Sequence, residues 1–374
     1  MKAPAAVAAL ALALAGCARS APPPPKMPPT DPFRGNEEDD LPRAKRELEV
    51  EILDSYQGAE AVDPEAWAGV VDPRTGITRI GVGPDDLAWT RDPKAGLPPR
   101  RWPLGGTGWA RSKLLEVHVA DDGTVGWAFD DVSWRMEVCG RTAVIPLRYT
   151  GVYLRDGDRW VPVLEHLSYA QPVSSLIEHG LLGIALDGKE GPPSWSHPVR
   201  VVVERAVGAV KDPDKAKTFA AGPTSLVLWP DPAHELRDGA VVPGPGLAQS
   251  FDAESVVIEG YRIGVSPGIG SGGSGVGWWA GTLRLKARKV DAAEEASAVE
   301  VRLRATFVLE QRAGRWSVIQ AHVSAPISDA ELAAVSVGSA VGADGTIQCE
   351  GAPAAPAPSP LGSLPAAPPA AGTP

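Results

Sequence analysis

The stretch Leu147–Ser168, LRYTGVYLRDGDRWVPVLEHLS, returns later in the chain as Leu303–Ser324, LRATFVLEQRAGRWSVIQAHVS. Eight positions carry the same residue at one constant spacing: Leu147/Leu303, Arg148/Arg304, Thr150/Thr306, Val152/Val308, Arg159/Arg315, Trp160/Trp316, His166/His322 and Ser168/Ser324. Each copy is an apolar, β-branched run, a turn containing Gly, and a second apolar run that begins near Trp. This pattern is typical of a β-hairpin. The sequence therefore predicts the same hairpin at two places.

The repeat extends towards the N-terminus of each copy. Gly83-Pro84-Asp85 matches Trp229-Pro230-Asp231, and Val125-Gly126-Trp127 matches Val276-Gly277-Trp278. The spacing between matched segments grows from 146 to 151 to 156 residues along the chain. Loop insertions in a duplicated domain would produce this one-directional growth, whereas chance identities would scatter. We therefore predict two copies of one unit, each with a helix, a short strand and a long antiparallel sheet.

Two helices and several strands follow from hydrophobic periodicity. Leu41, Ala44, Leu48 and Ile52 form one helical stripe, with Asp40 as the expected N-cap. A second helix begins at Pro198, and its apolar face is Val199, Val202, Val203, Ala206, Val207 and Val210. The predicted strands are Ile77–Val82, Leu115–Ala120, Val125–Val138, Ala143–Leu154, Trp160–Ser168, Leu226–Trp229, Ser255–Val265, Val276–Ala287, Ala298–Glu310 and Trp316–Ser324. Residues 105–115 are predicted as a loop, 246–253 as a short helix and 330–335 as a helical turn.

Length and composition limit the class of protein. The chain has 374 residues, 44% of them hydrophobic, which predicts about two folded domains. Its formal charge of −10 argues against binding to nucleic acid, because no basic cluster could neutralise phosphates. The pair Arg100-Arg101 is interpreted as a solvated loop feature.

The N-terminus predicts a secreted, lipid-anchored protein. Met1-Lys2 and the apolar run Ala5–Leu14 form a signal peptide over residues 1–16, too short for a mature membrane span. Leu14-Ala15-Gly16-Cys17 resembles the lipobox of bacterial lipoproteins, so Cys17 is the expected lipidation site; a plain secretory signal is the alternative. Ala18 after the Cys favours the outer membrane of the bacterial envelope. Residues 17–35 are then a Pro-rich tether, and residues 333–374 an Ala/Pro-rich disordered tail.

Two cysteines remain beyond the anchor, Cys139 and Cys349. An oxidising compartment permits a disulfide between them, but two independent thiols are also compatible with the sequence. Neither has a second Cys or His at metal-ligand spacing, so we predict no metal and no cofactor. Gly268–Gly273 matches G-x-G-x-x-G, yet no helix should follow it, and we interpret it as a hairpin loop.

The order of elements, with its hairpin pattern R-x-T-x-V, turn, R-W and H-x-S, resembles the SnoaL-like branch of the nuclear transport factor 2-like superfamily. The association domain of calcium/calmodulin-dependent kinase II is similar at the same strands. The resemblance implies an α+β fold with two cone-shaped domains, each a curved antiparallel sheet wrapped on N-terminal helices around a pocket. It places the domains at residues 36–175 and 198–332, with a linker at 176–197. Isolated members pair sheet to sheet, so the two copies could form an intramolecular pseudo-dimer.

The resemblance also implies where a site would lie, because in the family the strand Arg and the H-x-S His lie in or near the cone. The pocket candidates are Arg148, His166 and Trp160 in the first copy, and Arg304, His322 and Trp316 in the second. Strand alternation puts each Trp on the face of its His, and Glu165 on the face opposite His166. An Arg and a neutral His could hold a carboxylate or polarise a carbonyl; alternatively they are structural and bond to backbone carbonyls or to each other.

Three functional hypotheses follow. The first is a non-catalytic envelope module that binds a small apolar ligand or a partner protein. The second is an isomerase- or dehydratase-like enzyme that acts on a small apolar carbonyl compound in one cone. Such chemistry needs a pocket carboxylate, and Asp130, Asp131 and Glu165 are the acids on suitable strands of the first copy. Because Glu165 corresponds to Ala321 and no complete acid–base set emerges, we favour the first hypothesis. A purely scaffolding role, with both cones filled by side chains, is the third.

Overall fold

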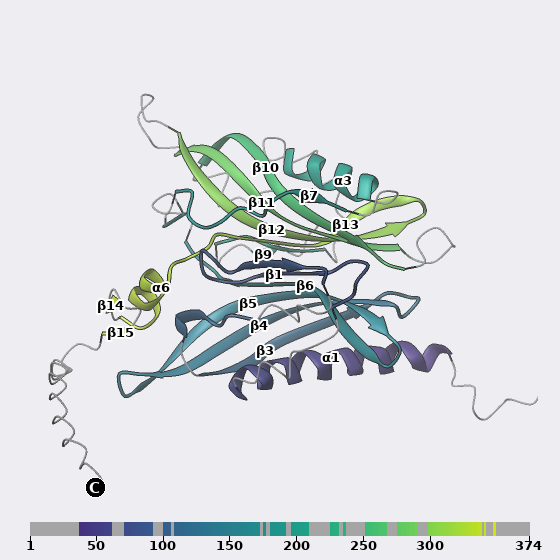
Figure 1. The fold of residues 1–374 in the computed structure, drawn as a ribbon, viewed down its shortest axis with the longest axis horizontal. Coiled ribbons are helices and arrows are strands. Elements are labelled where there is room, and N and C mark those ends of the chain that lie inside the picture. The colour runs from purple at the N-terminus through teal and green to yellow at the C-terminus, as the bar shows by residue number, and fades with distance from the viewer. Residues whose placement is uncertain are drawn as a thin grey trace, which may run out of the picture.

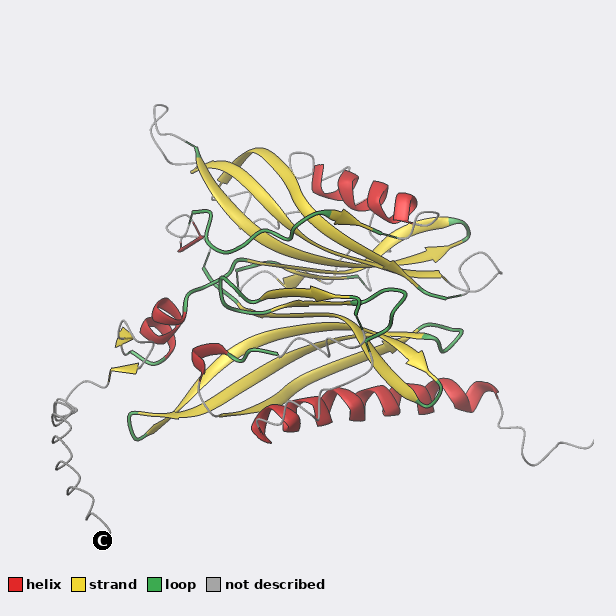
Figure 2. Ribbon diagram, viewed as in Figure 1, coloured by secondary structure: helices red, strands yellow, loops and turns green. Residues whose placement is uncertain are grey.

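The computed structural model describes residues 37–61, 71–92, 100–105, 108–172, 175–176, 180–191, 196–208, 225–231, 235–236, 251–267, 275–289, 298–338, 340–341 and 347–348. These residues form a mixed α+β fold in which two large sheets lie face to face (Figure 1). The long helices lie on the outer sides of the two sheets, away from the contact between them (Figure 2). The predicted signal peptide, Cys17, the tether and Cys349 lie outside the described residues.

The first unit consists of a helix and a six-stranded sheet. Its elements are α1 (Glu37–Ala61), β1 (Ile77–Ile80), β2 (Leu87–Thr90), the 3-10 turn η1 (Pro103–Gly105), β3 (Gly108–Val119), β4 (Val125–Val138), β5 (Arg141–Asp156) and β6 (Arg159–Tyr169). The strand order is β2-β1-β6-β5-β4-β3. Strands β3 to β6 form an antiparallel meander, and β1 pairs parallel with β6.

The second unit repeats this arrangement. Its elements are β7 (Lys189–Glu190), α3 (Ser196–Gly208), β8 (Leu226–Leu228), β9 (Glu235–Leu236), β10 (Phe251–Val265), β11 (Gly275–Lys289), β12 (Val299–Arg312) and β13 (Arg315–Ser324). The strand order is β7-β10-β11-β12-β13-β8-β9. Apart from β7, this is the order of the first sheet, and the short strand β8 again pairs parallel with the last long strand, β13. Both predicted hairpins are confirmed, as β5-β6 and β12-β13.

The apolar side chains fall into three layers. Ala44, Leu48 and Ile52 recur every four residues on α1, so they lie on one face and pack against the first sheet. Val199 and Val203 of α3 pack in the same way against the second sheet. A third cluster lies between the sheets: Ile80, Ala120, Val125, Val152, Leu154, Val163, Leu164, Val276, Trp278, Ala280, Val308 and Ile319. Burying each larger aliphatic side chain contributes about 1.5–3 kcal/mol, so the contact between the sheets is a core in its own right.

Three local predictions were wrong. Helix α1 begins at Glu37, so Asp40 lies inside it and pairs with Arg43 at 3.1 Å instead of capping its N-terminus. Strand β3 begins at Gly108 within the predicted loop, because a bulge at Ser112/Leu114 on this edge strand breaks the apolar alternation. Strand β10 covers residues 251–253, where a helix was predicted; residues 246–250 lie outside the described residues.

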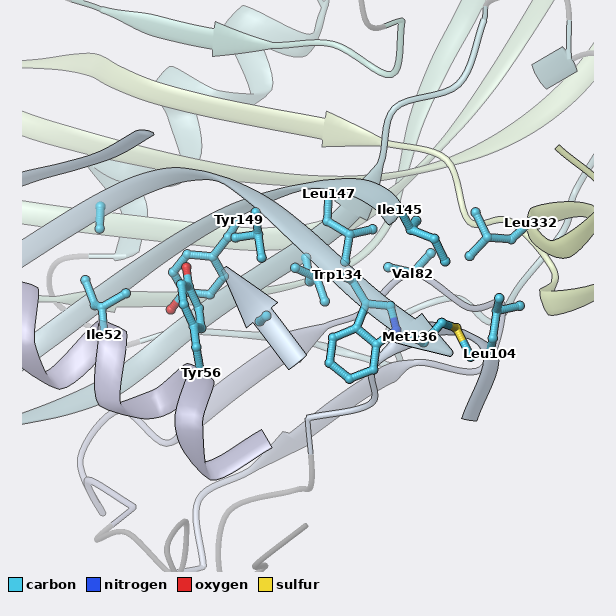
Figure 3. Close-up of a cluster of buried hydrophobic side chains, with 14 of the residues drawn as sticks. Ile52, Tyr56, Val82, Leu104, Trp134, Met136, Ile145, Leu147, Tyr149 and Leu332 are labelled. Atoms are coloured by element: carbon cyan, nitrogen blue, oxygen red, sulfur yellow. The ribbon is translucent and has the colours of Figure 1, made fainter. Parts of the chain in front are cut away.

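The chain beyond each last strand runs into the other unit. After β13, helix α6 (Asp329–Ser336) inserts Leu332 into the first unit beside Leu104, Met136 and Ile145 (Figure 3). A capping box of Ser328 and Glu331 begins this helix. After β6, Leu176 is buried in the core of the second unit. The exchange therefore ties the two units together at both ends.

The ordered chain extends past residue 332, where the disordered tail was expected to begin. Helix α6 runs to Ser336, and β14 (Ala340–Val341) pairs with β15 (Ile347–Gln348). Arg141 donates a hydrogen bond to the carbonyl of Val337, which holds the end of α6 against the turn between β4 and β5. Cys139 lies in that same turn and is disulfide-bonded, so it is not a free thiol. None of the helices within the described ranges is long and apolar enough to cross a membrane.

Candidate functional site

The Arg and His residues that recur in the two hairpins meet in the seam, which we define as the contact between β5-β6 and β12-β13. The imidazole rings of His166 and His322 stack at a centroid distance of 3.7 Å and an angle of 16°. Both side chains are buried. The two histidines, predicted as pocket candidates of separate domains, therefore meet each other between the two sheets.

Among the described residues, each imidazole bonds to two hydroxyl groups of the opposite sheet in the seam. His322 contacts Thr150 through Nδ1 at 2.9 Å and Ser168 through Nε2 at 2.8 Å. His166 contacts Thr306 through Nδ1 at 3.2 Å and Ser324 through Nε2 at 2.8 Å. The Thr and Ser that recur in each hairpin thus form hydrogen bonds with the histidine of the other copy. Burial is the main cause that holds the pKa of both histidines well below the usual value, so both rings are neutral at pH 7.

The two recurring arginines reach across the seam to backbone carbonyls. Arg148 donates from Nη1 to the carbonyl of Trp229 at 2.7 Å. Arg304 donates to the carbonyls of Gly81 at 2.9 Å and Gly83 at 2.8 Å, and also to Pro84. The loops that accept these bonds, Gly83-Pro84-Asp85 and Trp229-Pro230-Asp231, are the segments matched in the sequence. Each unit therefore clamps the same loop of the other, which agrees with the structural alternative for these residues.

Trp160 and Trp316 do not share a face with His166 and His322. The register of β5-β6 shifts between Val152 and Tyr153, which leaves Val163 as an extra residue, and that of β12-β13 shifts in the same way at Ile319. A bulge reverses the alternation of side chains beyond it. Trp160 consequently packs in the core under α1 and Trp316 against the core under α3. The expectation of one shared face was wrong because a bulge cannot be read from simple period-two alternation.

A charged cluster lies inside the first unit, on the side of the sheet that faces α1. Glu165 is buried and points away from His166, as predicted. Its carboxylate bonds to the guanidinium groups of Arg79 and Arg100 and accepts the hydroxyl of Tyr149 at 3.1 Å. Arg79 is the register partner of Glu165 in the parallel pair β1-β6, which explains how the two side chains meet. We call Arg79, Arg100 and Glu165 the buried triad.

Arg100 is enclosed by aromatic rings as well as by the carboxylate. Its guanidinium lies 5.9 Å from the ring of Tyr56, 5.8 Å from Trp102 and 5.3 Å from Tyr149. Its Nη1 donates to the hydroxyl of Ser55 on α1 at 3.2 Å. Such cation–π contacts stabilise a guanidinium that is removed from water. The interpretation of Arg100 as a solvated loop residue was therefore wrong, while its neighbour Arg101 is exposed, as expected.

The charges of the buried triad stabilise one another. Burial alone would raise the pKa of Glu165, but Arg100 and then Arg79 outweigh it and hold this pKa at about 2. Burial opposes the charged form of Arg100 too, yet Glu165 raises its pKa above the usual value. Burial raises the pKa of Tyr149 well above its usual value, so its hydroxyl stays protonated and donates. At neutral pH Glu165 and Arg100 are therefore both charged and stabilise each other.

A second acid of the first unit, Asp130, lies near the triad. It accepts hydrogen bonds from the hydroxyl of Tyr56 at 3.0 Å, the hydroxyl of Ser112 at 3.1 Å and the amide of Leu114 at 3.2 Å. Burial raises the pKa of Asp130, and these three donors oppose the shift. The carboxylate thus has defined structural partners, one of them on α1.

A cavity of about 230 Å³ opens beside the buried triad. Its lining combines charged, aromatic and aliphatic side chains: Arg79, Ile80, Gly81, Asp85, Asp86, Leu87, Ala88, Arg100, Arg101, Tyr149, Glu165 and Leu167. Arg101 lies at the exposed side, 3.6 Å from Asp86. The cavity can accept a small molecule that carries a polar group. In the described part of the chain no group of three His, Cys, Asp or Glu side chains is placed to hold a metal ion.

Arg79 and Arg100 were missed in the sequence as members of a site. Arg79 interrupts the apolar strand Ile77–Val82, and an arginine in a strand with buried neighbours on both sides needs an acid partner. That signal, together with Glu165 in the equally apolar last strand, could have indicated an ion pair. Arg100 follows two prolines outside any regular element, and no sequence signal places it beside α1.

Comparison with known proteins identifies partial likenesses only. No protein-family model matches the chain, and no curated protein matches it. An NTF2-like protein from Cytophaga hutchinsonii is 12% identical, with a TM-score of 0.27 over 35% of this chain and 98% of its own. The kinase II hub homology domain from Chlamydomonas reinhardtii is 16% identical, with a TM-score of 0.26 over 34% of this chain and 98% of its own. An NTF2-like protein of unknown function from Pseudomonas putida is 19% identical, with a TM-score of 0.22 over 36% and 90%. Likeness at this level says nothing about activity.

Proposed function

We propose that this chain is a non-catalytic, lipid-anchored module of the bacterial envelope that binds a small ligand in the first unit. In this proposal residues 36–175 and 198–332 are two SnoaL-like domains that form an intramolecular pseudo-dimer. The matching strand orders, the bulges at Val163 and Ile319 and the reciprocal contacts of Arg148 and Arg304 support a duplicated origin.

The proposal of ligand binding rests on the cavity beside the buried triad. Its lining brings three guanidinium groups together with the carboxylates of Asp85, Asp86 and Glu165 and with aliphatic and aromatic surface. Guanidinium groups present planar sets of donors that fit carboxylates and other oxyanions. Because Glu165 already pairs with Arg79 and Arg100, we propose that Arg101, the most exposed of the three, bonds to an anionic group of the ligand. The ligand then has an anionic group and an apolar body, in contrast to the purely apolar ligand expected from the sequence.

The same geometry argues against the isomerase- or dehydratase-like alternative. A general base works best with a pKa near the operating pH. Glu165 has a pKa of about 2 and is held by two guanidinium groups, so it is a weak base. Asp130 is engaged by three donors and does not line the cavity. Asp131 does not line the cavity either, so none of the three acids named from the sequence has both a place in the cavity and the properties of a catalytic base.

The envelope location rests on the lipobox around Cys17, with Ala18 favouring the outer membrane. The disulfide at Cys139 adds support, because structural disulfides form in oxidising compartments. Metabolic labelling with a fatty-acid analogue tests the anchor directly. The full-length chain should take up the label and fractionate with membranes, and Cys17→Ser should do neither. Equal labelling of both would contradict the anchor.

The ligand proposal is tested by thermal unfolding of the secreted chain with matched pairs of small molecules, such as benzoate and benzamide. We expect benzoate to raise Tm in a concentration-dependent way, because a ligand that binds only the folded state stabilises it. Arg101→Gln should weaken this shift, because Arg101 lines the exposed side of the cavity. Arg159→Gln, at the exposed turn between β5 and β6, is the matched control and should leave the shift unchanged. If a broad set of small acids and amides leaves Tm unchanged, the binding function is wrong.

A further inference from the structure

We propose that the seam between the two sheets is an acid-sensitive contact that opens when His166 and His322 take up protons, while each sheet keeps its own fold. The proposal does not depend on the ligand-binding function. It starts from a geometric fact: both rings are buried at the centre of the seam and stack on each other at 3.7 Å.

The hydrogen bonds of the two rings all cross the seam. A neutral imidazole has one donor and one acceptor nitrogen, and the hydroxyls of Thr150, Ser168, Thr306 and Ser324 can adapt to either role. Each hydroxyl group belongs to the sheet opposite the ring that it contacts. The rings therefore stabilise the contact between the sheets and take no part in the core under α1 or α3.

Protonation of the two rings would place two positive charges face to face where both side chains are buried. Two charges of the same sign a few ångströms apart repel each other strongly where the local dielectric is low. An imidazolium also needs acceptors at both nitrogens, so all four hydroxyls would have to turn and accept. The closed seam therefore favours two neutral rings.

The charged groups that face the rings oppose protonation further. From β5 comes Arg148 and from β12 comes Arg304, each buried in the seam. The strands β1 and β8 add no acid on this side, since Arg79 faces Glu165 and Leu226–Leu228 is apolar. Acids lie farther out beside the arginines: Asp131 in register with Arg148, Asp231 in the loop that Arg148 contacts, Asp85 and Asp86 in the loop that Arg304 contacts, and Glu310 farther along β12.

The direction of the pH effect follows from these surroundings. Burial is the main cause that lowers the pKa of both rings, followed by Arg304 for His166, and by His166 and then Arg148 for His322. In an opened seam the rings would return towards the ordinary value near 6.5. The open state then binds more protons than the closed state below pH 6.5, so the closed seam loses stability as the pH falls. The pKa of Glu165, at about 2, lies well below the ordinary value for histidine.

The test follows the radius of gyration by X-ray scattering and the far-ultraviolet circular dichroism of the full secreted chain between pH 7.5 and 4.5. We expect the radius to rise with acid while the strand signal is retained. In the variant His166→Gln/His322→Gln, which keeps hydrogen-bonding side chains without a titrating ring, the midpoint should move down by about 1 pH unit or more. His118→Gln is the matched control, because His118 is an exposed histidine on β3, and its midpoint should equal that of the unmodified chain.

Two results would overturn the proposal. One is a double variant that opens at the same pH as the unmodified chain. The other is a strand signal that disappears together with the increase in radius, which would mean unfolding instead of opening. If the double variant does not fold, the imidazole resonances of the unmodified chain decide the question. Two histidines must then stay neutral below the ordinary pKa of histidine while the seam is closed, and resonances of these rings that titrate near 6.5 in the closed state would contradict the proposal.

Discussion

The interiors of the two units differ at matched positions of the same sheet framework. Glu165 of the first unit corresponds to Ala321 of the second, and Arg79, its partner on β1, corresponds to Val227 on β8. Tyr149 corresponds to Ala305 on the preceding strand. The first interior is therefore a charged cluster beside a cavity, and the second is an apolar core in which Phe307 packs edge-on against Trp279 at 5.6 Å.

In contrast to the two interiors, the seam is formed by residues that recur in both units. The shared Arg, Thr, His and Ser of each hairpin all contact the other sheet. A reciprocal contact between similar surfaces needs the same residues on both sides, as in a two-fold symmetric dimer. An interior needs only to be filled and hydrogen-bonded. Internal repetition therefore marks the contact between the units, and the residues that differ mark the place where a ligand site can exist in one unit alone.

The largest expected effect comes from removing the carboxylate of the first interior. We expect Glu165→Ala to lower the free energy of unfolding by about 3–5 kcal/mol, because Arg79 and Arg100 lose the charge that they share in a buried site. Urea denaturation followed by circular dichroism measures this change.

The second unit supplies the control for that variant. Arg79→Val/Glu165→Ala copies the pair Val227 and Ala321, so it should recover about 1–2 kcal/mol relative to Glu165→Ala alone. If the double variant is less stable than Glu165→Ala, the two side chains do not compensate each other, and the ion pair does not account for the difference between the two interiors.

A smaller effect is expected from acid. The pKa of Glu165 is about 2 in the folded chain against 4.5 for an ordinary Glu, so the unfolded chain binds more protons between these values. The contribution of Glu165 is complete above pH 4.5 and is lost as the pH falls towards 2, by a total of about 3 kcal/mol. The difference in urea stability between the unmodified chain and Glu165→Gln should shrink over this interval. A difference that is independent of pH would show that Glu165 is not ionised in the fold.

The smallest effect concerns the turns of the two matched hairpins. Ala313 has a φ of 48°, a left-handed conformation that Gly157 adopts at the same position of the first hairpin with a φ of 65°. Glycine adopts this region without a Cβ clash. Ala313→Gly should therefore stabilise the chain by up to about 1 kcal/mol, and Gly157→Ala should destabilise it by a similar amount. A rise in Tm for Ala313→Gly together with a fall in Tm for Gly157→Ala supports the comparison, and a change in the same direction for both variants contradicts it.

Part of the fold could be predicted because local patterns decide it. The two hairpins, the stripe of Ala44 and Leu48 on α1 and the apolar face of α3 were visible as periodicity and repetition. The edge strand β3 was underestimated, because a strand with a bulge and an exposed side does not alternate regularly. Of the candidate site, the opposite orientations of Glu165 and His166 were predicted correctly, whereas the buried triad and the stacking of the two imidazole rings were not.

By itself the sequence determined that one hairpin exists twice. It also determined that Arg148 and Thr150 share a face of one strand and that His166 and Ser168 share a face of the next, because both results follow from identity and spacing along the chain. Only the tertiary structure decided what these side chains contact. His166 and His322 lie in the seam, and Trp160 lies in the interior because of the bulge at Val163. The tertiary structure also brought Arg100 to Glu165 across 65 residues. The physical reason is that a sheet has two faces with equal local patterns, and only packing against helices or another sheet distinguishes them.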